Sequence, residues 1–263
     1  MKLMEVQTWR VVAVLAMSIS MLAGCKPRNE PVDNKQVSVQ EQKIDSIPLI
    51  QSKTIDMEVL KSESCMAEGC TQYNLQTVDT NVDWINQYFD ARIKKAEPTA
   101  FSAEPNEKVN VGDDSTAGLS QSSLSVRYIS QWYKVATFIV NSYTYSAGAA
   151  HGLYHKEYVN FDLGKEQRIS LQDVLVKGAE KKVVDELYNA NASWLNDHSI
   201  LREKLQLSDN FYYGAEGIVF VYPLYELASY AEGMTELVLP YRVTQTLIKP
   251  EYLPSLPHYK KTN

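Results

Sequence analysis

The residues that could do chemistry most directly are two histidines four positions apart, His151 and His155. On a helix this spacing places both imidazoles on one face, which is how several zinc sites begin. However, the glutamate of the His-Glu-x-x-His metalloprotease motif is missing, and Gly148 and Gly152 border the first histidine. Strand-like alternation follows, and residues four apart in a strand are roughly 13 Å from each other. We therefore expect no metal and no other cofactor, and favour a glycine-bordered turn in which His151 hydrogen-bonds the backbone.

Other catalytic templates are absent from the sequence, which contains no Gly-x-Ser-x-Gly, Ser-x-x-Lys or Gly-x4-Gly-Lys motif. The carboxylates of Asp162, Glu226 and Glu232 could act as acids or bases, but no spacing pairs two of them. The sequence therefore predicts that the protein is not an enzyme.

Tyrosine is abundant, with 17 residues, and tyrosine suits recognition because the ring buries area while the hydroxyl stays paired. More often, such residues line a packed interface, and both interpretations stay open. Several tyrosines cluster at Tyr212, Tyr213, Tyr222, Tyr225 and Tyr230.

The start of the chain predicts export. The apolar run Val11–Met21 is far shorter than the roughly 20 residues that a membrane-spanning helix needs. Leu22-Ala23-Gly24-Cys25 follows it and resembles the lipobox of bacterial lipoproteins. We therefore expect a signal peptide over residues 1–24, a lipid on Cys25, and a flexible polar tether over residues 25–45. The residue after the cysteine is Lys26 rather than the aspartate that signals inner-membrane retention, which resembles an outer-membrane address.

The other two cysteines, Cys65 and Cys70, form an even pair in an oxidising compartment. A metal site would need two further ligands, and none is close in sequence. We expect a disulfide at the tip of a hairpin, with Gly69 in the turn. Closing so small a ring stabilises by about 2 kcal/mol on the chain-entropy argument.

The elements that position these residues follow from periodicity. We expect a hairpin around the two cysteines, a helix from Val82 to Ala96 capped by Thr80, and an exposed loop from Pro98 to Ser123. Further strands are expected at 125–145, 154–161, 218–222 and 234–239, and helices at 170–175, 183–195 and 241–247. This order predicts an α+β fold, an antiparallel sheet with helices packed on one face.

Five ordered segments resemble a known extracytoplasmic domain family. They are Ser146–Gly152, Tyr158–Leu163, Ile169–Leu175, Gly217–Gly233 and Val238–Tyr241. They are similar to the "Gly-Gly-Ala-His-Gly … Asn-Phe-Asp-Leu … Ile-Thr-Leu-x-Asp-Leu-Phe" pattern of a domain-of-unknown-function family. That family forms the extracytoplasmic part of RsiV-type anti-sigma factors and an accessory domain of PdaC-type peptidoglycan deacetylases.

The resemblance covers roughly residues 47–253 and implies an N-terminal half over residues 46–141 and an RsiV-like C-terminal half over 142–255. It also implies lysozyme as a ligand, because the anti-sigma relative is a lysozyme receptor. The transmembrane and cytoplasmic parts of that relative and the catalytic domain of the deacetylases are not recognised here. The metal histidines of that catalytic domain are not to be equated with His155.

We therefore expect a non-enzymatic lipoprotein on the periplasmic face of the outer membrane that binds lysozyme or peptidoglycan fragments. The net charge of −6 suits a basic partner through steering and argues against nucleic acid. The candidate ligand-binding residues are Gly148, His151, Gly152 and Tyr154. The alternatives are an accessory factor or enzyme of peptidoglycan remodelling, and a purely structural lipoprotein.

Overall fold

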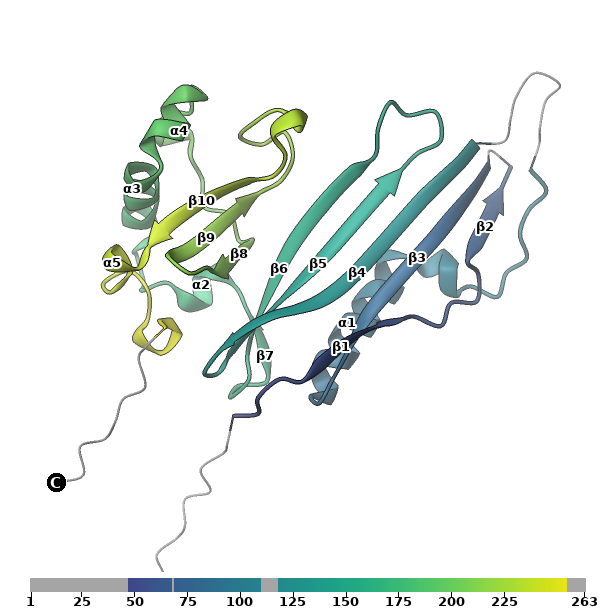
Figure 1. Cartoon of the computed structure of the whole chain (residues 1–263), viewed down its shortest axis with the longest axis horizontal. Coiled ribbons are helices and arrows are strands. Elements are labelled where there is room, and N and C mark those ends of the chain that lie inside the picture. The colour runs from purple at the N-terminus through teal and green to yellow at the C-terminus, as the bar shows by residue number, and fades with distance from the viewer. Residues whose placement is uncertain (1–46, 68, 110–117, 255–263) are drawn as a thin grey trace, which may run out of the picture. The chain divides into compact units, whose positions relative to one another are not determined.

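The alternating segments of the chain form a seven-stranded sheet in the computed structural model, which describes residues 47–67, 69–109 and 118–254 (Figure 1). The strand order is β1-β3-β4-β5-β6-β7, and β2 pairs with β3. All neighbours are antiparallel except β3 and β4. The strands are β1 (Ser52–Asp56), β2 (Glu63–Met66), β3 (Gly69–Thr80), β4 (Gly118–Trp132), β5 (Val135–Tyr145), β6 (Leu153–Asp162) and β7 (Gln167–Ile169).

Helix α1 (Asp83–Ala96) covers one face of this sheet. Its apolar residues Ile85, Phe89 and Ile93 recur at helical spacing and are fully buried. The Phe89 ring packs against the rings of Phe138 and Phe161, with centroids 5.3 and 5.7 Å away. Burying each such side chain stabilises the fold by about 1.5–3 kcal/mol. The core therefore lies between α1 and one face of the sheet.

The parallel pair β3–β4 was not expected from the sequence, which predicted an antiparallel sheet. The connection between these strands contains α1 and the short 3-10 helix η1 (Pro98–Phe101), and a parallel pair needs such a long crossover. The prediction of an exposed loop from Pro98 to Ser123 is wrong at both ends, because η1 begins it and β4 starts at Gly118. Near the start of β4, Ser122 is buried and its hydroxyl donates a hydrogen bond to the Glu97 carboxylate at 2.6 Å, so a polar residue occupies the covered face there.

The C-terminal part forms a second, three-stranded antiparallel sheet with its own core. Its strands are β8 (Phe211–Tyr213), β9 (Gly217–Tyr222) and β10 (Thr235–Pro240), in the order β10-β9-β8. Every residue of β9 is buried, which agrees with the continuous apolar run that predicted this strand. The sequence did not predict that these strands form a sheet separate from the first one.

Helices α2 (Leu171–Val174), α3 (Glu180–Ala190), α4 (Ala192–Asp197) and α5 (Tyr241–Thr244) accompany the second sheet, and α3 packs on β10. Short 3-10 helices occur at η2 (Arg202–Lys204), η3 (Tyr230–Glu232) and η4 (Pro250–Tyr252). The fold is therefore α+β, as predicted. Within the described ranges, no helix is both long enough and apolar enough to span a membrane.

The starts of α2 and α1 are capped in different ways, and the second tests the prediction that Thr80 is a cap. Ser170 caps α2 in a capping box, in which its hydroxyl and backbone N–H both bond the Asp173 carboxylate at 2.8 Å. Thr80 does not cap α1, because the helix begins at Asp83 with Val82 as its N-cap. Instead, the Thr80 hydroxyl accepts a hydrogen bond from the backbone N–H of Val82.

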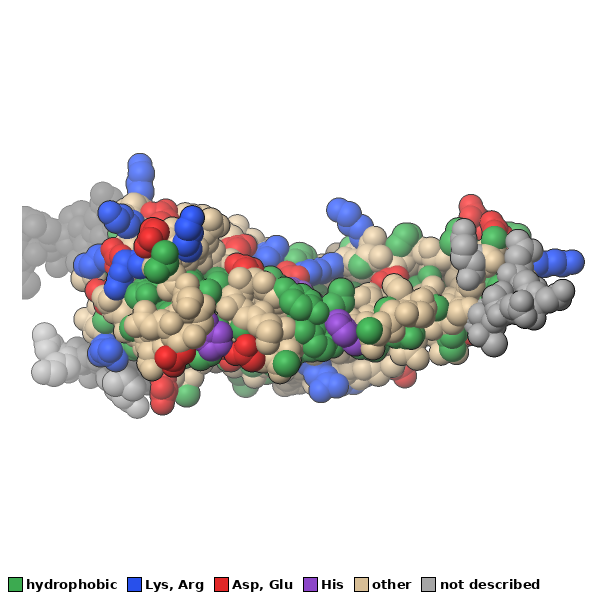
Figure 2. All heavy atoms as spheres, turned by 90° about the horizontal axis from the view of Figure 1, so that it is seen from above, with side chains coloured by type: hydrophobic (Ala, Val, Ile, Leu, Met, Phe, Trp, Pro, Cys, Tyr) green, Lys and Arg blue, Asp and Glu red, His purple; other side chains and the backbone are tan. Residues whose placement is uncertain are grey.

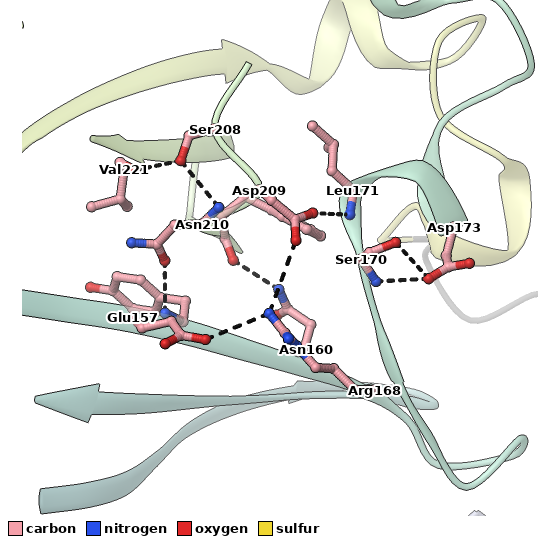
Figure 3. A network of polar contacts seen from close by, with 12 residues as sticks. Glu157, Asn160, Arg168, Ser170, Leu171, Asp173, Ser208, Asp209, Asn210 and Val221 are labelled. Atoms are coloured by element: carbon pink, nitrogen blue, oxygen red, sulfur yellow. Dashed lines mark hydrogen bonds and ion pairs between the residues drawn. The ribbon is translucent and has the colours of Figure 1, made fainter. Parts of the chain in front are cut away.

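Polar side chains join the two sheets (Figure 3). The buried Asn160 on β6 accepts a hydrogen bond from Thr137 at 2.7 Å and donates one to the carbonyl of Phe211 at 2.8 Å. Asn210 reaches the edge of β6, where its side-chain amide accepts from the N–H of Tyr158 at 2.8 Å and donates to the carbonyl of Lys156 at 2.7 Å. The Asn210 amide thereby pairs with the strand as a neighbouring backbone would.

Candidate functional site

The turn between β5 and β6 carries the predicted site residues Gly148, His151 and Gly152 and is glycine-bordered, as expected, whereas Tyr154 lies in β6. Gly148 is exposed and has a φ of +81°, a left-handed conformation that favours glycine. Gly152 is buried instead, and a Cβ atom there would lie 2.4 Å from the Tyr143 ring. Glycine at 152 therefore serves the close approach of the Tyr143 ring rather than a special φ.

His151 is exposed, and its ring stacks on Tyr230 at a centroid distance of 4.1 Å. Its Nδ1 atom lies 3.0 Å from the carbonyl oxygen of Gly152, which is the backbone contact that the sequence predicted. The same carbonyl accepts a hydrogen bond from the Tyr230 hydroxyl at 2.9 Å. The turn is thus fixed against η3, although the two segments are about 80 positions apart in the sequence.

Two further tyrosines extend this stack. Tyr154 is half-buried, with its ring 6.2 Å from that of Tyr230, and the Tyr225 ring stacks on Tyr230 at 5.8 Å. Figure 2 shows the face seen from above, on which histidine side chains lie beside hydrophobic ones. We call the group of His151, Tyr154, Tyr225 and Tyr230 the aromatic cluster.

The other clustered tyrosines separate into packing and surface positions. Tyr213 and Tyr222 are buried in the second core. Tyr212 stacks on Tyr158 at 4.2 Å and donates a hydrogen bond to Glu236. Of the five tyrosines, only Tyr225 and Tyr230 join the aromatic cluster, so both interpretations of the tyrosines apply, each to different residues.

A second histidine site secures η3. His198, at the end of α4, lies with its Nε2 atom 2.5 Å from the Glu232 carboxylate, and its Nδ1 atom contacts the carbonyl of Trp194 at 2.8 Å. Hydrogen bonding to Glu232 and then to the Trp194 carbonyl raises the pKa of His198. Hydrogen bonds from His198 and Ser229 lower the pKa of Glu232. This ion pair holds the segment that carries Tyr230.

Next to the aromatic cluster, the uncovered face of the first sheet forms a pocket of about 370 Å³, the sheet-face pocket. Cross-strand neighbours place its outward side chains in two rows. These are Asn74, Ser123, Tyr143 and Tyr154, and Gln76, Ser125, Asn141 and Lys156. The serines are short and lie between longer neighbours, so the surface is hollow at the centre.

The sheet-face pocket is cationic, although the protein is acidic. Arg127 and Lys156 line it, and none of its lining residues is Asp or Glu. His155 pairs with Ser142, and Ser142 with Leu124, so the His155 side chain belongs to the opposite face of the sheet. In the described part of the chain, neither Arg127 nor Lys156 has a carboxylate within ion-pair distance. Tyr154 belongs both to this pocket and to the aromatic cluster, which makes one continuous candidate surface.

The sequence analysis predicted residues at one edge of this candidate surface and did not predict the strand residues that form its floor. The predicted residues Gly148, His151, Gly152 and Tyr154 lie at or beside the sheet-face pocket. The polar residues of β3, β4 and β5 were not singled out. Their signal was the alternation of polar with apolar residues, as in Ser123-Leu124-Ser125-Val126-Arg127, which marks a strand with one uncovered face.

His151 and His155 belong to different parts of the hairpin, since His151 lies in the turn and His155 pairs with Ser142 within β6. Across the described ranges, one group of three ligand-type side chains is close enough to share an ion, namely Glu63, Cys65 and Cys70. The two sulfur atoms of that group are bonded to each other, which confirms the predicted disulfide. Cys65 and Cys70 pair across β2 and β3, at the hairpin tip as expected. The proposed lipid site, Cys25, lies outside the described residues.

The three carboxylates considered as acids or bases lie in different surroundings. Asp162 is fully buried, and its carboxylate is bound by Lys134 at 3.0 Å, by Tyr252 at 3.1 Å and by the N–H of Gly164 at 3.0 Å. Glu232 pairs with His198, and Glu226 follows the turn after Pro223. Asp162 thus closes the turn after β6 and ties it to η4.

Comparison with known proteins found a family model that matches part of this chain. Residues 165–242 match the family described as "Protein of unknown function (DUF3298)". The match covers the second sheet and the helices that accompany it. No curated protein matches the chain.

Two solved structures share the fold. One is a DUF3298 family protein from Pseudomonas aeruginosa PAO1, with a TM-score of 0.58 and 21% identity, covering 80% of this chain and 99% of that one. The other is a member of the same family from Bacteroides fragilis NCTC 9343, with a TM-score of 0.54 and 15% identity, covering 78% of this chain and 95% of that one. At these identities the likeness shows the fold alone.

Proposed function

We propose that the protein is a non-enzymatic, lipid-anchored envelope protein that binds peptidoglycan fragments in the sheet-face pocket. The observation that carries this proposal is the charge of the pocket, which holds Arg127 and Lys156 without a carboxylate among the lining residues. Carboxylates bind such cations through charge-assisted hydrogen bonds. Peptidoglycan fragments offer carboxylates on their peptides together with sugar hydroxyls and amides.

The neutral lining of the pocket suits the rest of such a ligand. The amides of Asn74, Gln76 and Asn141 can each donate and accept, and the serine hydroxyls can do both. Tyr143 and Tyr154 supply aromatic area at one end for the apolar face of a sugar ring. A lysozyme-sized partner would also reach the aromatic cluster at His151.

Lysozyme is the second candidate ligand, through the resemblance to RsiV-type anti-sigma factors. The net charge of −6 favours association with a basic protein. The cations of the sheet-face pocket oppose it locally, so we rank peptidoglycan fragments first. The resemblance to RsiV-type and PdaC-type domains and the outer-membrane anchor are parts of the same proposal.

Calorimetry of the purified full-length protein with a disaccharide-tetrapeptide muropeptide tests the proposal. We expect binding that weakens with salt, because the pairs are partly exposed. We expect Arg127→Gln and Lys156→Gln each to weaken it by about tenfold, the effect of losing one charge-assisted hydrogen bond. Lys181→Gln is the matched control, since Lys181 is exposed on α3 and outside the pocket.

Two outcomes would contradict this assignment. No heat with the muropeptide at tens of micromolar protein would exclude the ligand class at useful affinity. Muropeptide binding that survives the double Arg127→Gln, Lys156→Gln substitution unchanged would exclude the pocket. Binding of lysozyme in the same assay without muropeptide binding would reverse the ranking of the two ligands.

A further inference from the structure

A second pocket, of about 520 Å³, lies at the tip of the β4–β5 hairpin, and we call it the hairpin pocket. It shares no lining residue with the sheet-face pocket. One wall is the hairpin, Trp132 to Val135, and the opposite wall is η4 with the residues that follow it. Tyr213 of β8 contributes from the second sheet.

The hairpin presents two aromatic side chains on a fixed backbone. Trp132 is 42% exposed and Tyr133 is 78% exposed. Tyr133 has a φ of +49°, and its carbonyl accepts a hydrogen bond from the Gln131 side chain at 2.7 Å. Gln131 also bonds the carbonyl of Pro48 and the N–H of Ile50, both at 2.9 Å. Rings held on so constrained a turn lose little conformational freedom when they bind a ligand.

The buried hydroxyl of Tyr213 has no hydrogen-bond partner among the described residues. A buried tyrosine hydroxyl usually has one, so this atom marks a place for a ligand atom or a water molecule. Burial raises the pKa of Tyr213, so the hydroxyl stays protonated and can donate at neutral pH.

Two other polar groups at this pocket, Lys134 and Tyr252, are already engaged, and the Glu251 carboxylate is exposed. The Lys134 ammonium lies 3.0 Å from the Asp162 carboxylate and 4.8 Å from the centre of the Tyr252 ring. The Tyr252 hydroxyl donates to Asp162. An anionic ligand would compete for the Lys134–Asp162 pair and meet the Glu251 carboxylate, and a purely apolar ligand would leave the Tyr213 hydroxyl unpaired.

We propose that the hairpin pocket binds a neutral saccharide, with a sugar ring stacked on Trp132 or Tyr133 and a sugar oxygen bonded to the hydroxyl of Tyr213. A pyranose combines an apolar C–H face with hydroxyls, which matches exposed aromatic rings beside one unpaired donor. This inference goes beyond the proposed function, because it concerns a different pocket and an uncharged ligand.

Two neutral trisaccharides, chitotriose and maltotriose, serve as probes for the full-length protein, with binding followed by NMR through the backbone amide signals, which Trp132→Ala retains. We expect at least one to bind with millimolar affinity. Trp132→Ala and Tyr133→Ala should each weaken binding by roughly 3- to 10-fold, and Tyr213→Phe by about fivefold. Leu201→Ala is the control, because Leu201 is 55% exposed and lies outside both pockets and outside the aromatic cluster.

The result is independent of the sheet-face pocket if Arg127→Gln leaves trisaccharide binding unchanged. No shift of the amide signals with either sugar at 10 mM, roughly the weak end of the expected range, overturns the proposal. Unchanged affinity of Tyr213→Phe also overturns it, because no sugar oxygen would then bond the buried hydroxyl.

Discussion

At the residue scale, the aromatic cluster depends on contacts that come from distant parts of the chain. The His151 ring needs Tyr230 for its stack, and Tyr230 in turn lies on a segment that Glu232 ties to His198. Ser229 donates a further hydrogen bond to Glu232 at 3.0 Å. A change at His198 is therefore expected to reach the surface around His151 through η3.

The ion pair between His198 and Glu232 should make the stability of the η3 segment depend on pH. The pKa of His198 is raised above its ordinary value of 6.5, so its contribution to stability is complete below 6.5 and is lost as the pH rises through the raised pKa. The pKa of Glu232 is lowered from 4.5, so its contribution is complete above 4.5 and is lost as the pH falls through the lowered pKa. The pair is thus strongest between these two limits.

We expect Glu232→Gln to lower the pKa of His198 toward its ordinary value, because the first cause of the raised pKa is the hydrogen bond to Glu232. An NMR titration of the His198 ring in both proteins measures this. Glu226→Gln is the control, since Glu226 lies in the same connection between β9 and β10 and does not contact His198. An identical His198 titration in the wild type and Glu232→Gln would show that the pair does not form in solution.

At the scale of elements, the two sheets are joined by side chains that form the hydrogen bonds a neighbouring strand would otherwise form. Asn210 satisfies one N–H and one carbonyl at the edge of β6, beyond the three-residue partner strand β7. Ser208 supports Asn210 from the other side, since its hydroxyl donates to the carbonyl of Val221 and accepts from the N–H of Asn210 (Figure 3). The end of β6 is therefore tied to the second sheet without a continuous ladder.

We expect Asn210→Ala to lower the free energy of unfolding by about 1–3 kcal/mol, because it leaves the N–H of Tyr158 and the carbonyl of Lys156 without partners. Asn210→Asp keeps the acceptor and loses the donor, so its free energy of unfolding should lie between those of the wild type and Asn210→Ala. Urea unfolding measures the difference. Asn189→Ala, an exposed asparagine that only accepts from Arg202, should stay within about 0.5 kcal/mol of the wild type. Equal effects of Asn210→Ala and Asn189→Ala would mean that the hydrogen bonds of Asn210 to β6 add no measurable stability.

At the scale of the whole molecule, two hydrophobic cores belong to one compact part of the chain. One lies between α1 and the first sheet, and the other between the second sheet and its helices. The proposed pockets use the first sheet's uncovered face and the junction of the β4–β5 hairpin with η4. Ligand binding at either pocket should therefore stabilise the native state, since neither surface exists in the unfolded chain.

The lipid anchor is the remaining prediction at this scale, and it rests on Leu22-Ala23-Gly24-Cys25 after a short apolar run. We expect a fatty-acid probe to label the wild type and the protein to fractionate with membranes. Cys25→Ser should abolish both, whereas Cys65→Ser should retain the label because Cys65 is used in the disulfide. Equal labelling of the wild type and Cys25→Ser would disprove acylation at this cysteine.

The sequence by itself determined the features whose signals are local. The Cys65–Cys70 disulfide, the capping box at Ser170, the turn at Asp162 and the apolar strand from Ile218 to Tyr222 all depend on residues within about ten positions of each other. Periodicity and short-range hydrogen bonds dictate such features, so they could be predicted. The same reasoning located the turn around His151.

Only the tertiary structure decided which distant segments meet. The parallel β3–β4 pair, the separation into two sheets and the stack of Tyr230 on His151 all join residues far apart in the sequence. Arg127 and Lys156 come from different strands and share a pocket because the pairing of β4, β5 and β6 brings their outward faces together. Such pairing is specified by burial of the opposite face of the sheet against α1. That burial depends on the packing of the whole core, which no single segment encodes.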